Sequence, residues 1–159
     1  MKTLLKITTL LLLISYSSYG QNEFEESAIE RGLIFEFQES LKMGGGAASF
    51  DYDNDGDDDI YVVGGQNPDG LFENDGEGNF INVSLVSNIG NLTSSIMTTS
   101  VVTGDIDNDG YREIFVGTIG EATQGFNSIT RNFLLKYDPQ TSSYSDITQS
   151  SLLTDESFA

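Results

Sequence analysis

The sequence lacks two residue types that carry much of protein chemistry: its 159 residues include no cysteine and no histidine. Without cysteine the chain can form no disulfide, so its fold must be held by its core and by any ions that it binds. Zinc, copper and haem sites lose their usual ligands, and a catalytic triad that uses histidine is excluded. The ligand inventory leaves the cations that bind oxygen, Ca²⁺ or Mg²⁺, and Ca²⁺ is the more favoured in an extracellular setting.

Basic residues are also scarce. Seven lysines and arginines stand against 25 aspartates and glutamates, which gives a formal net charge of −18. A surface so acidic repels nucleic acid and anionic membranes, so neither is expected as a partner. An acidic surface of this kind attracts cations, which are therefore the expected partners.

No apolar run is long enough to cross a membrane. The apolar segment Leu10 to Ile14 is far shorter than the roughly 20 residues that a spanning helix needs. It follows Lys2 and Lys6 and precedes the small residues Ser18 to Gly20, which predicts a secretory signal peptide over residues 1–20. We therefore expect a secreted or cell-surface protein, with the periplasm as a further possibility. Cleavage would remove both lysines and no acid, and lipid attachment at the cleavage zone is excluded because no cysteine is there.

Two short segments, residues 51–59 and 105–113, share one pattern of acidic residues. In both, acids occupy positions 1, 3, 5 and 9, and a glycine at position 6 permits the sharp turn that gathers them around one point. Position 7 would add a main-chain carbonyl. The candidate ligands are Asp51, Asp53, Asp55, Asp59 and the carbonyl of Asp57 in the first loop, and Asp105, Asp107, Asp109, Glu113 and the carbonyl of Tyr111 in the second. We expect calcium there, with magnesium less favoured, and folding coupled to metal binding because the acids repel one another without an ion.

The main rival for such a loop is the EF-hand, with its dockerin-type relatives. An EF-hand needs a bidentate glutamate at position 12 and helices on both sides. Position 12 is Val62 in the first loop and Val116 in the second, and strand-like runs flank both. Catalysis is not expected either, because carboxylates bound to Ca²⁺ cannot donate protons and there is no histidine to activate a nucleophile.

The pattern around the loops predicts an all-β fold. Short runs rich in Val, Ile, Phe and Tyr alternate with Asp-Gly and Gly-Asn turns, and only Glu25 to Arg31 favours a helical turn. Each copy contains four expected strands, as in a β-propeller blade. In the first copy these are 47–50, 60–65, 71–73 and 80–84, and in the second 100–103, 114–117, 135–137 and 144–148.

This organisation predicts about two four-stranded blades of an incomplete propeller. After the signal peptide, we expect a lead-in and the end of a preceding blade over 21–46, one repeat over 47–98, a second over 99–151 and the start of a truncated next repeat over 152–159. A propeller needs at least four blades. The chain is therefore expected to be a fragment of a longer protein, or to close by oligomerising.

Three segments carry a resemblance to a known family: Gly44 to Val62, Leu71 to Phe80 and the lead-in Ala28 to Phe35. Together they resemble the FG-GAP/VCBS repeat and, more narrowly, the bacterial relatives of cartilage acidic protein that occur with a UnbV/ASPIC domain. The resemblance implies an integrin-α-like β-propeller with calcium in the hairpin loops of its blades. It also implies a role in adhesion, surface display or protein and glycan interaction, without catalysis. The second copy departs from the family pattern at Glu113 and at Asp138-Pro139, so the metal affinity of its loop is in question.

Two functions follow as hypotheses. The first is a secreted, calcium-binding, non-catalytic module for adhesion or for binding a protein or glycan, with the variable connections Gly64 to Gly70 and Thr118 to Arg131 as its ligand face. The second is the scaffold portion of a larger exported enzyme or assembly factor, with a further domain beyond Ala159.

Overall fold

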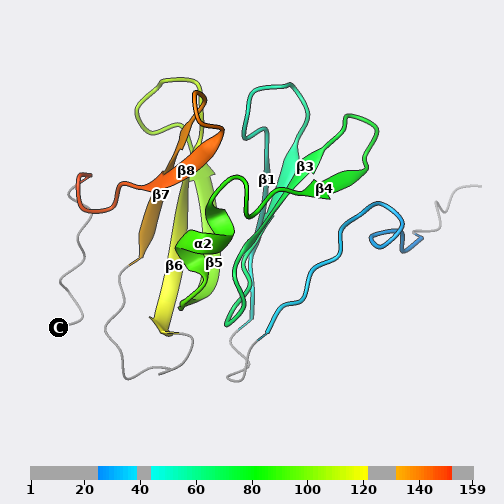
Figure 1. Ribbon diagram of the computed structural model, residues 1–159, viewed down its shortest axis with the longest axis horizontal. Helices are drawn as coiled ribbons and strands as arrows, with labels where there is room; N and C mark the ends of the chain where they lie inside the picture. The colour runs from blue at the N-terminus through cyan, green and yellow to red at the C-terminus, as the bar shows by residue number, and fades with distance from the viewer. Residues whose placement is uncertain (1–24, 39–43, 122–131, 152–159) are drawn as a thin grey trace, which may run out of the picture.

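The computed structural model describes residues 25–38, 44–121 and 132–151, and within them the chain forms two four-stranded antiparallel sheets (Figure 1). In each sheet the strands pair in sequence order. The first sheet contains β1 (Ala47–Phe50), β2 (Asp59–Val62), β3 (Gly70–Asn74) and β4 (Phe80–Asn82). The second contains β5 (Ile96–Gly104), β6 (Glu113–Glu121), β7 (Phe133–Asp138) and β8 (Ser143–Asp146). The all-β fold with two blade-like sheets is thus confirmed.

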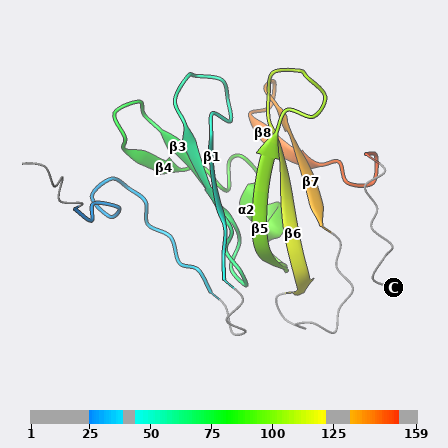
Figure 2. The same ribbon diagram turned by 180° about the vertical axis from the view of Figure 1, so that it is seen from behind.

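Each acidic loop is the hairpin connection between the first two strands of its sheet. Phe50 pairs with Asp59 where the first loop closes, and Gly104 pairs with Glu113 where the second loop closes. Both loops lie at the same end of the two sheets, at the top of Figure 1, and the view from behind agrees (Figure 2). The equivalent strand pairing therefore carries two similar loops to neighbouring places.

The two sheets share one hydrophobic core. Burial alternates along β2, where Asp59 and Tyr61 are buried and Ile60 and Val62 are partly exposed, as a period-2 pattern requires. The side chains that fill the core come from both sheets, the acidic loop of the first and the connection between them. Its buried members are Phe50, Tyr52, Tyr61, Val63, Leu71, Val83, Ile89, Ile114, Val116, Phe133, Leu135, Tyr137 and Tyr144.

A short helix, α2 (Ile89–Thr93), lies between the sheets (Figure 1). The sequence predicts a helical turn only at Glu25 to Arg31, where the structure has a turn, and it does not predict α2. The helix forms because Ile89 and Thr93, one turn apart, are both fully buried, and the Thr93 hydroxyl donates to the Ile89 carbonyl at 3.0 Å. Tertiary packing outweighs the weak helix propensity of this segment.

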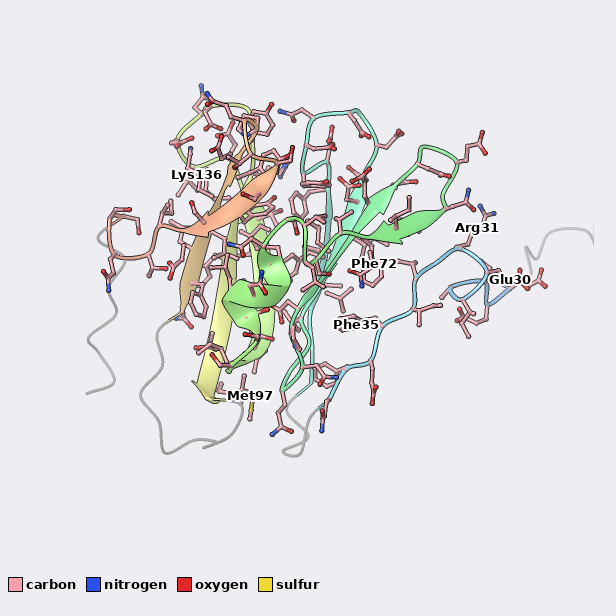
Figure 3. The ribbon with its side chains drawn as sticks, viewed as in Figure 1. Glu30, Arg31, Phe35, Phe72, Met97 and Lys136 are labelled. Atoms are coloured by element: carbon pink, nitrogen blue, oxygen red, sulfur yellow. The ribbon has the colours of Figure 1, made fainter. Side chains whose placement is uncertain are left out.

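The lead-in, residues 25–38, runs along the side of the first sheet that faces away from the second (Figure 3). The Phe80 amide donates to the Arg31 carbonyl at 2.7 Å, and the ring of Phe35 meets the edge of Phe72 with ring centroids 6.0 Å apart. Gly32 is needed here: its φ is +86° and a Cβ would lie 2.1 Å from the Phe80 carbonyl oxygen. Phe72 is thereby covered on its outer face.

The predicted signal peptide (1–20), residues 21–24 and 39–43 of the lead-in, residues 122–131 of the variable connection and the segment 152–159 lie outside the described residues. Among the described residues no helix has the length and apolar character that a membrane crossing requires.

Candidate metal centres

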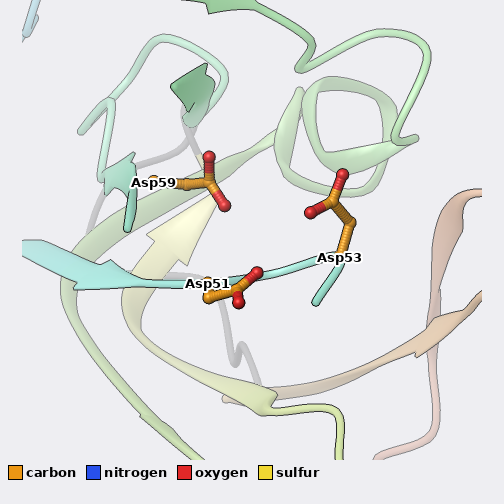
Figure 4. Close-up of side chains that lie close together, drawn as sticks. All are labelled: Asp51, Asp53 and Asp59. Atoms are coloured by element: carbon orange, nitrogen blue, oxygen red, sulfur yellow. The ribbon is translucent and has the colours of Figure 1, made fainter. Parts of the chain in front are cut away.

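Three carboxylates of the first loop converge. Asp51, Asp53 and Asp59 each offer an oxygen, and these oxygens all lie within 4.8 Å of one another. Figure 4 shows the three side chains around a common space. Oxygens bound to one Ca²⁺ at about 2.3–2.6 Å are separated by at most about 5 Å, so the spacing matches that of a calcium ligand set.

The loop backbone fixes Asp51 at this point. Its Oδ1 accepts from the Asp55 amide at 3.1 Å and its Oδ2 accepts from the Gly56 amide at 2.9 Å. The turn requires positive φ values at two residues, 66° at Asn54 and 102° at Gly56. Asn and Gly are the residues that adopt this conformation most readily, which explains positions 4 and 6 of the motif.

Asp59 is the buried member of the group. It is fully buried, its Oδ2 accepts from the Tyr52 amide at 3.0 Å and its Oδ1 accepts from the Asn74 amide at 2.8 Å. Burial raises the pKa of Asp59 to about 6, and burial, with the neighbouring Asp55 carboxylate, raises the pKa of Asp53. Both carboxylates are costly to ionise in the absence of a cation, so a bound divalent ion would be favourable here.

The second loop repeats the main features of this geometry. Oxygens of Asp105, Asp107 and Glu113 lie within 4.8 Å of one another. The Asp105 carboxylate accepts from two loop amides at 3.1 Å, and Glu113 Oε2 accepts from the Ile106 amide at 2.9 Å, as Asp59 does from Tyr52. Glu113 is 2% exposed, so the longer side chain still fills the buried position.

The second group differs from the first in holding a cation from the protein itself. The Lys136 ammonium, from β7, donates to Asp107, to Asp109 Oδ2 at 2.6 Å and to Glu113 Oε1 at 3.4 Å. Its hydrogen bonds to Asp107 and Asp109 raise the pKa of Lys136. The first group therefore fits a divalent cation as it stands, whereas an amino group already uses the oxygens of the second.

Other predicted ligands lie outside these two groups. Asp55 Oδ1 accepts from the Asp57 amide at 2.9 Å, and Asp109 Oδ1 accepts from the Tyr111 amide at 2.9 Å. The Asp57 carboxylate lies against the next hairpin, where a Cβ on Gly76 would be 2.6 Å from its Oδ2. The position-5 side chains thus shape the loops in this structure, and the roles of the Asp57 and Tyr111 carbonyls stay predictions.

The two loops contact each other. Asn54 Nδ2 of the first loop donates to the Gly110 carbonyl of the second at 3.0 Å. Four tyrosines also pack together, with the ring centroids of the contacting pairs 5.2 to 6.5 Å apart: Tyr52, Tyr111, Tyr137 and Tyr144. The tyrosine cluster therefore joins the first acidic loop to the second loop and to β7 and β8.

A family model described as the FG-GAP-like repeat matches residues 51–116. The chain carries an FG-GAP-like repeat. The match runs from the first residue of the first loop through the second loop and into β6, so both acidic groups fall inside it. No curated protein matches the chain in sequence. The narrower resemblance to relatives of cartilage acidic protein stays a prediction.

The connection Gly64 to Gly70, expected as part of the ligand face, is buried at both of its ends. Its three glycines (Gly64, Gly65 and Gly70) and Asp69 are buried, and a Cβ on Gly64 would lie 2.3 Å from the Asn67 carbonyl oxygen. Asp69 is 1% exposed and holds the two sheets together. Pro68 is exposed and Gln66 and Asn67 are partly exposed, so the role of this connection as a ligand face stays a prediction.

Proposed function

We propose that the chain is an exported, non-catalytic β-propeller repeat module in which Ca²⁺ is structural, and that the module binds an extracellular protein or glycan. The observation that carries the proposal is the convergence of Asp51, Asp53 and buried Asp59 inside an FG-GAP-like repeat. The ion would brace the β1–β2 hairpin in a chain that has no cysteine. Export is supported by the signal-peptide pattern of residues 1–20.

Calcium is favoured over magnesium by the donor set. The group supplies carboxylate oxygens from a loop, which suits the larger ion with its flexible coordination, whereas Mg²⁺ keeps several waters and demands near-octahedral geometry. Extracellular calcium modules bind with dissociation constants on the order of 10⁻⁴–10⁻³ M. We expect the first loop to fall in this range.

The calcium assignment is tested by titrating Ca²⁺ and Mg²⁺ into the metal-stripped chain by calorimetry, with thermal melts in parallel. We expect Ca²⁺ to bind and to raise the melting temperature, and Asp51→Asn to remove both effects. The matched control is Asp58→Asn, which makes the same charge change at an exposed residue of the same loop and should leave calcium binding intact. Melting curves that are identical in calcium and in chelator would refute the assignment.

The binding role is tested separately, with the calcium-loaded chain immobilised and presented to a glycan array and to purified extracellular matrix proteins. Binding that is lost in chelator would support the proposal, since the ion would then maintain the binding surface. Binding that Asp51→Asn leaves unchanged would separate any ligand site from the metal. A fusion of residues 1–20 to a reporter enzyme tests export.

A further inference from the structure

A single basic side chain, Lys136 on β7, enters the acidic group of the second loop (Figure 3). Its ammonium group forms ion pairs with Asp107, Asp109 and Glu113. Two of these, Asp107 and Glu113, belong to the set whose oxygens lie within 4.8 Å of one another. The amino group and a divalent ion would therefore compete for the same carboxylates.

The first loop has a residue of opposite charge at the matching place. Strand pairing sets the correspondence: Ile60 pairs with Phe72 in the first sheet, and Ile114, at the same position of the second loop, pairs with Leu135. The next residues along β3 and β7 are Glu73 and Lys136. Glu73 Oε2 accepts from the Tyr52 hydroxyl at 2.8 Å. The amide of the next residue, Asn74, donates to Asp59 Oδ1 at 2.8 Å, so β3 runs beside the first acidic group at this point.

We propose that Lys136 is a built-in counter-cation that takes the place of the metal ion in the second loop, so that the first loop, with Glu73 at the equivalent position, is the divalent-cation site of the pair. The assignment of the first loop as the divalent-cation site rests on the proposed function. The role of Lys136 is supported independently by its ion pairs with Asp107, Asp109 and Glu113.

Charge and geometry both support this division. In the second loop one ammonium compensates part of the negative charge and supplies N–H donors to three carboxylates, so the loop can keep its fold without an ion. A Ca²⁺ bound to the same oxygens would lie beside a positive charge, and the two cations would repel each other strongly at that separation. In the first loop the corresponding charge is negative and adds to the attraction. The same backbone turn thus serves one site that needs an ion and one that supplies its own.

Lys136 forms ion pairs with the loop residues Asp107 and Asp109 and with Glu113, yet its side chain remains accessible to solvent. Its side chain is 30% exposed, while that of Glu113 beneath it is 1% exposed. Displacing the ammonium would leave buried Glu113 without its cation unless an ion replaced it. Calcium binding to the second loop would therefore require Lys136 to leave, and its amino group would become more reactive.

The test counts calcium ions on the metal-stripped full chain by calorimetry. We expect the wild-type chain to bind one ion, Asp51→Asn to remove it and Asp105→Asn to leave it. We expect Lys136→Glu, which copies Glu73, to bind a second ion, and Asp105→Asn in the Lys136→Glu background to abolish that second site. A wild-type chain that binds two ions, one of them lost in Asp105→Asn, would overturn the proposal, as would a folded Lys136→Glu chain that gains no site.

Chemical acetylation of Lys136, followed by mass spectrometry, gives a readout that needs no variant at this position. We expect its acetylation rate in the wild-type chain to be the same with and without Ca²⁺, because the ion does not displace it. A rise of tenfold or more in calcium would overturn the proposal. If the wild-type chain binds no ion but Lys136→Glu gains one that Asp105→Asn removes, the role of Lys136 holds and the first-loop assignment fails.

Discussion

The carboxylate of Asp69, in the connection between β2 and β3, accepts a hydrogen bond from the Thr98 hydroxyl of β5 at 2.5 Å. One buried side chain therefore joins the two sheets. Asp69 also accepts from the Tyr61 hydroxyl at 2.5 Å and from the Gly64 amide at 2.8 Å, and its own amide donates to Thr93 Oγ1 of α2 at 2.9 Å. The junction between sheets thus depends on a polar network as well as on apolar packing.

We expect substitution of Asp69 to weaken the whole fold. Asp69→Ala leaves two buried hydroxyls and one amide without an acceptor, which should lower the free energy of unfolding by about 3 kcal/mol or more. Asp69→Asn keeps one acceptor oxygen and should cost about 1 kcal/mol. Denaturant unfolding of both variants measures this, with Glu36→Gln as the control at an exposed acid. Equal stabilities of Asp69→Ala and the control would contradict the network.

Asp69 should also make stability depend on pH. Burial raises its pKa above the ordinary 3.8 in spite of three hydrogen bonds that oppose the shift. Between the unfolded value and this raised folded value, the folded chain binds more protons than the unfolded chain, so the contribution of Asp69 to stability falls as pH rises through that window and is constant above it. Unfolding free energies in chelator should show the wild type losing its advantage over Asp69→Asn as pH increases from about 4. An advantage that grows with pH would contradict the sign.

Much of this architecture is predictable from sequence because it is local. The strands follow from short Val, Ile, Phe and Tyr runs between Gly and Asp turns, and the paired loops follow from acids at fixed spacing around a glycine. The helix α2 and the role of Asp69 are not predictable in this way. Each depends on contacts between sheets, and neither Ile89 nor Asp69 carries a local signal that separates it from a loop residue.

The opposite charges of Glu73 and Lys136 at equivalent positions can be predicted from the sequence. Aligning the two repeats on their acidic loops and counting forward does not find them, because the connection before β7 is longer than the one before β3. Aligning the two repeats on the apolar runs of β3 and β7 places Glu73 and Lys136 at equivalent positions. What the sequence alone lacks is the strand register that brings these side chains back to the loops.

Two buried tyrosines, Tyr61 of β2 and Tyr144 of β8, offer a matched pair of hydroxyl deletions. Among the described residues, the Tyr144 hydroxyl is the buried side-chain group with no hydrogen-bond partner, whereas the Tyr61 hydroxyl donates to Asp69. Removing an unsatisfied buried hydroxyl breaks no hydrogen bond and removes the cost of burying that hydroxyl away from water. Tyr144→Phe should therefore leave the free energy of unfolding unchanged or raise it by up to about 1 kcal/mol. Tyr61→Phe should destabilise by about 1–3 kcal/mol. Thermal or denaturant unfolding distinguishes the two, and a larger loss for Tyr144→Phe would mean that its hydroxyl is satisfied in solution.

The contact between the loops gives a last prediction. Asn54 and Asn108 occupy position 4 of their loops with positive φ values of 66° and 60°, but it is Asn54 whose side chain crosses to the other loop, at the Gly110 carbonyl. Glycine adopts this backbone conformation without strain, so Asn54→Gly should cost about 0.5–1.5 kcal/mol for the lost hydrogen bond, while Asn108→Gly should be close to neutral. Alanine at either position should cost about 1 kcal/mol or more through backbone strain. The four variants are compared by chemical denaturation in chelator, so that metal binding does not enter the comparison. If the two glycine variants proved equally stable, the inter-loop hydrogen bond would contribute nothing to the fold, and the packing of Tyr52 against Tyr137 and Tyr144 would have to hold the first loop to the second sheet.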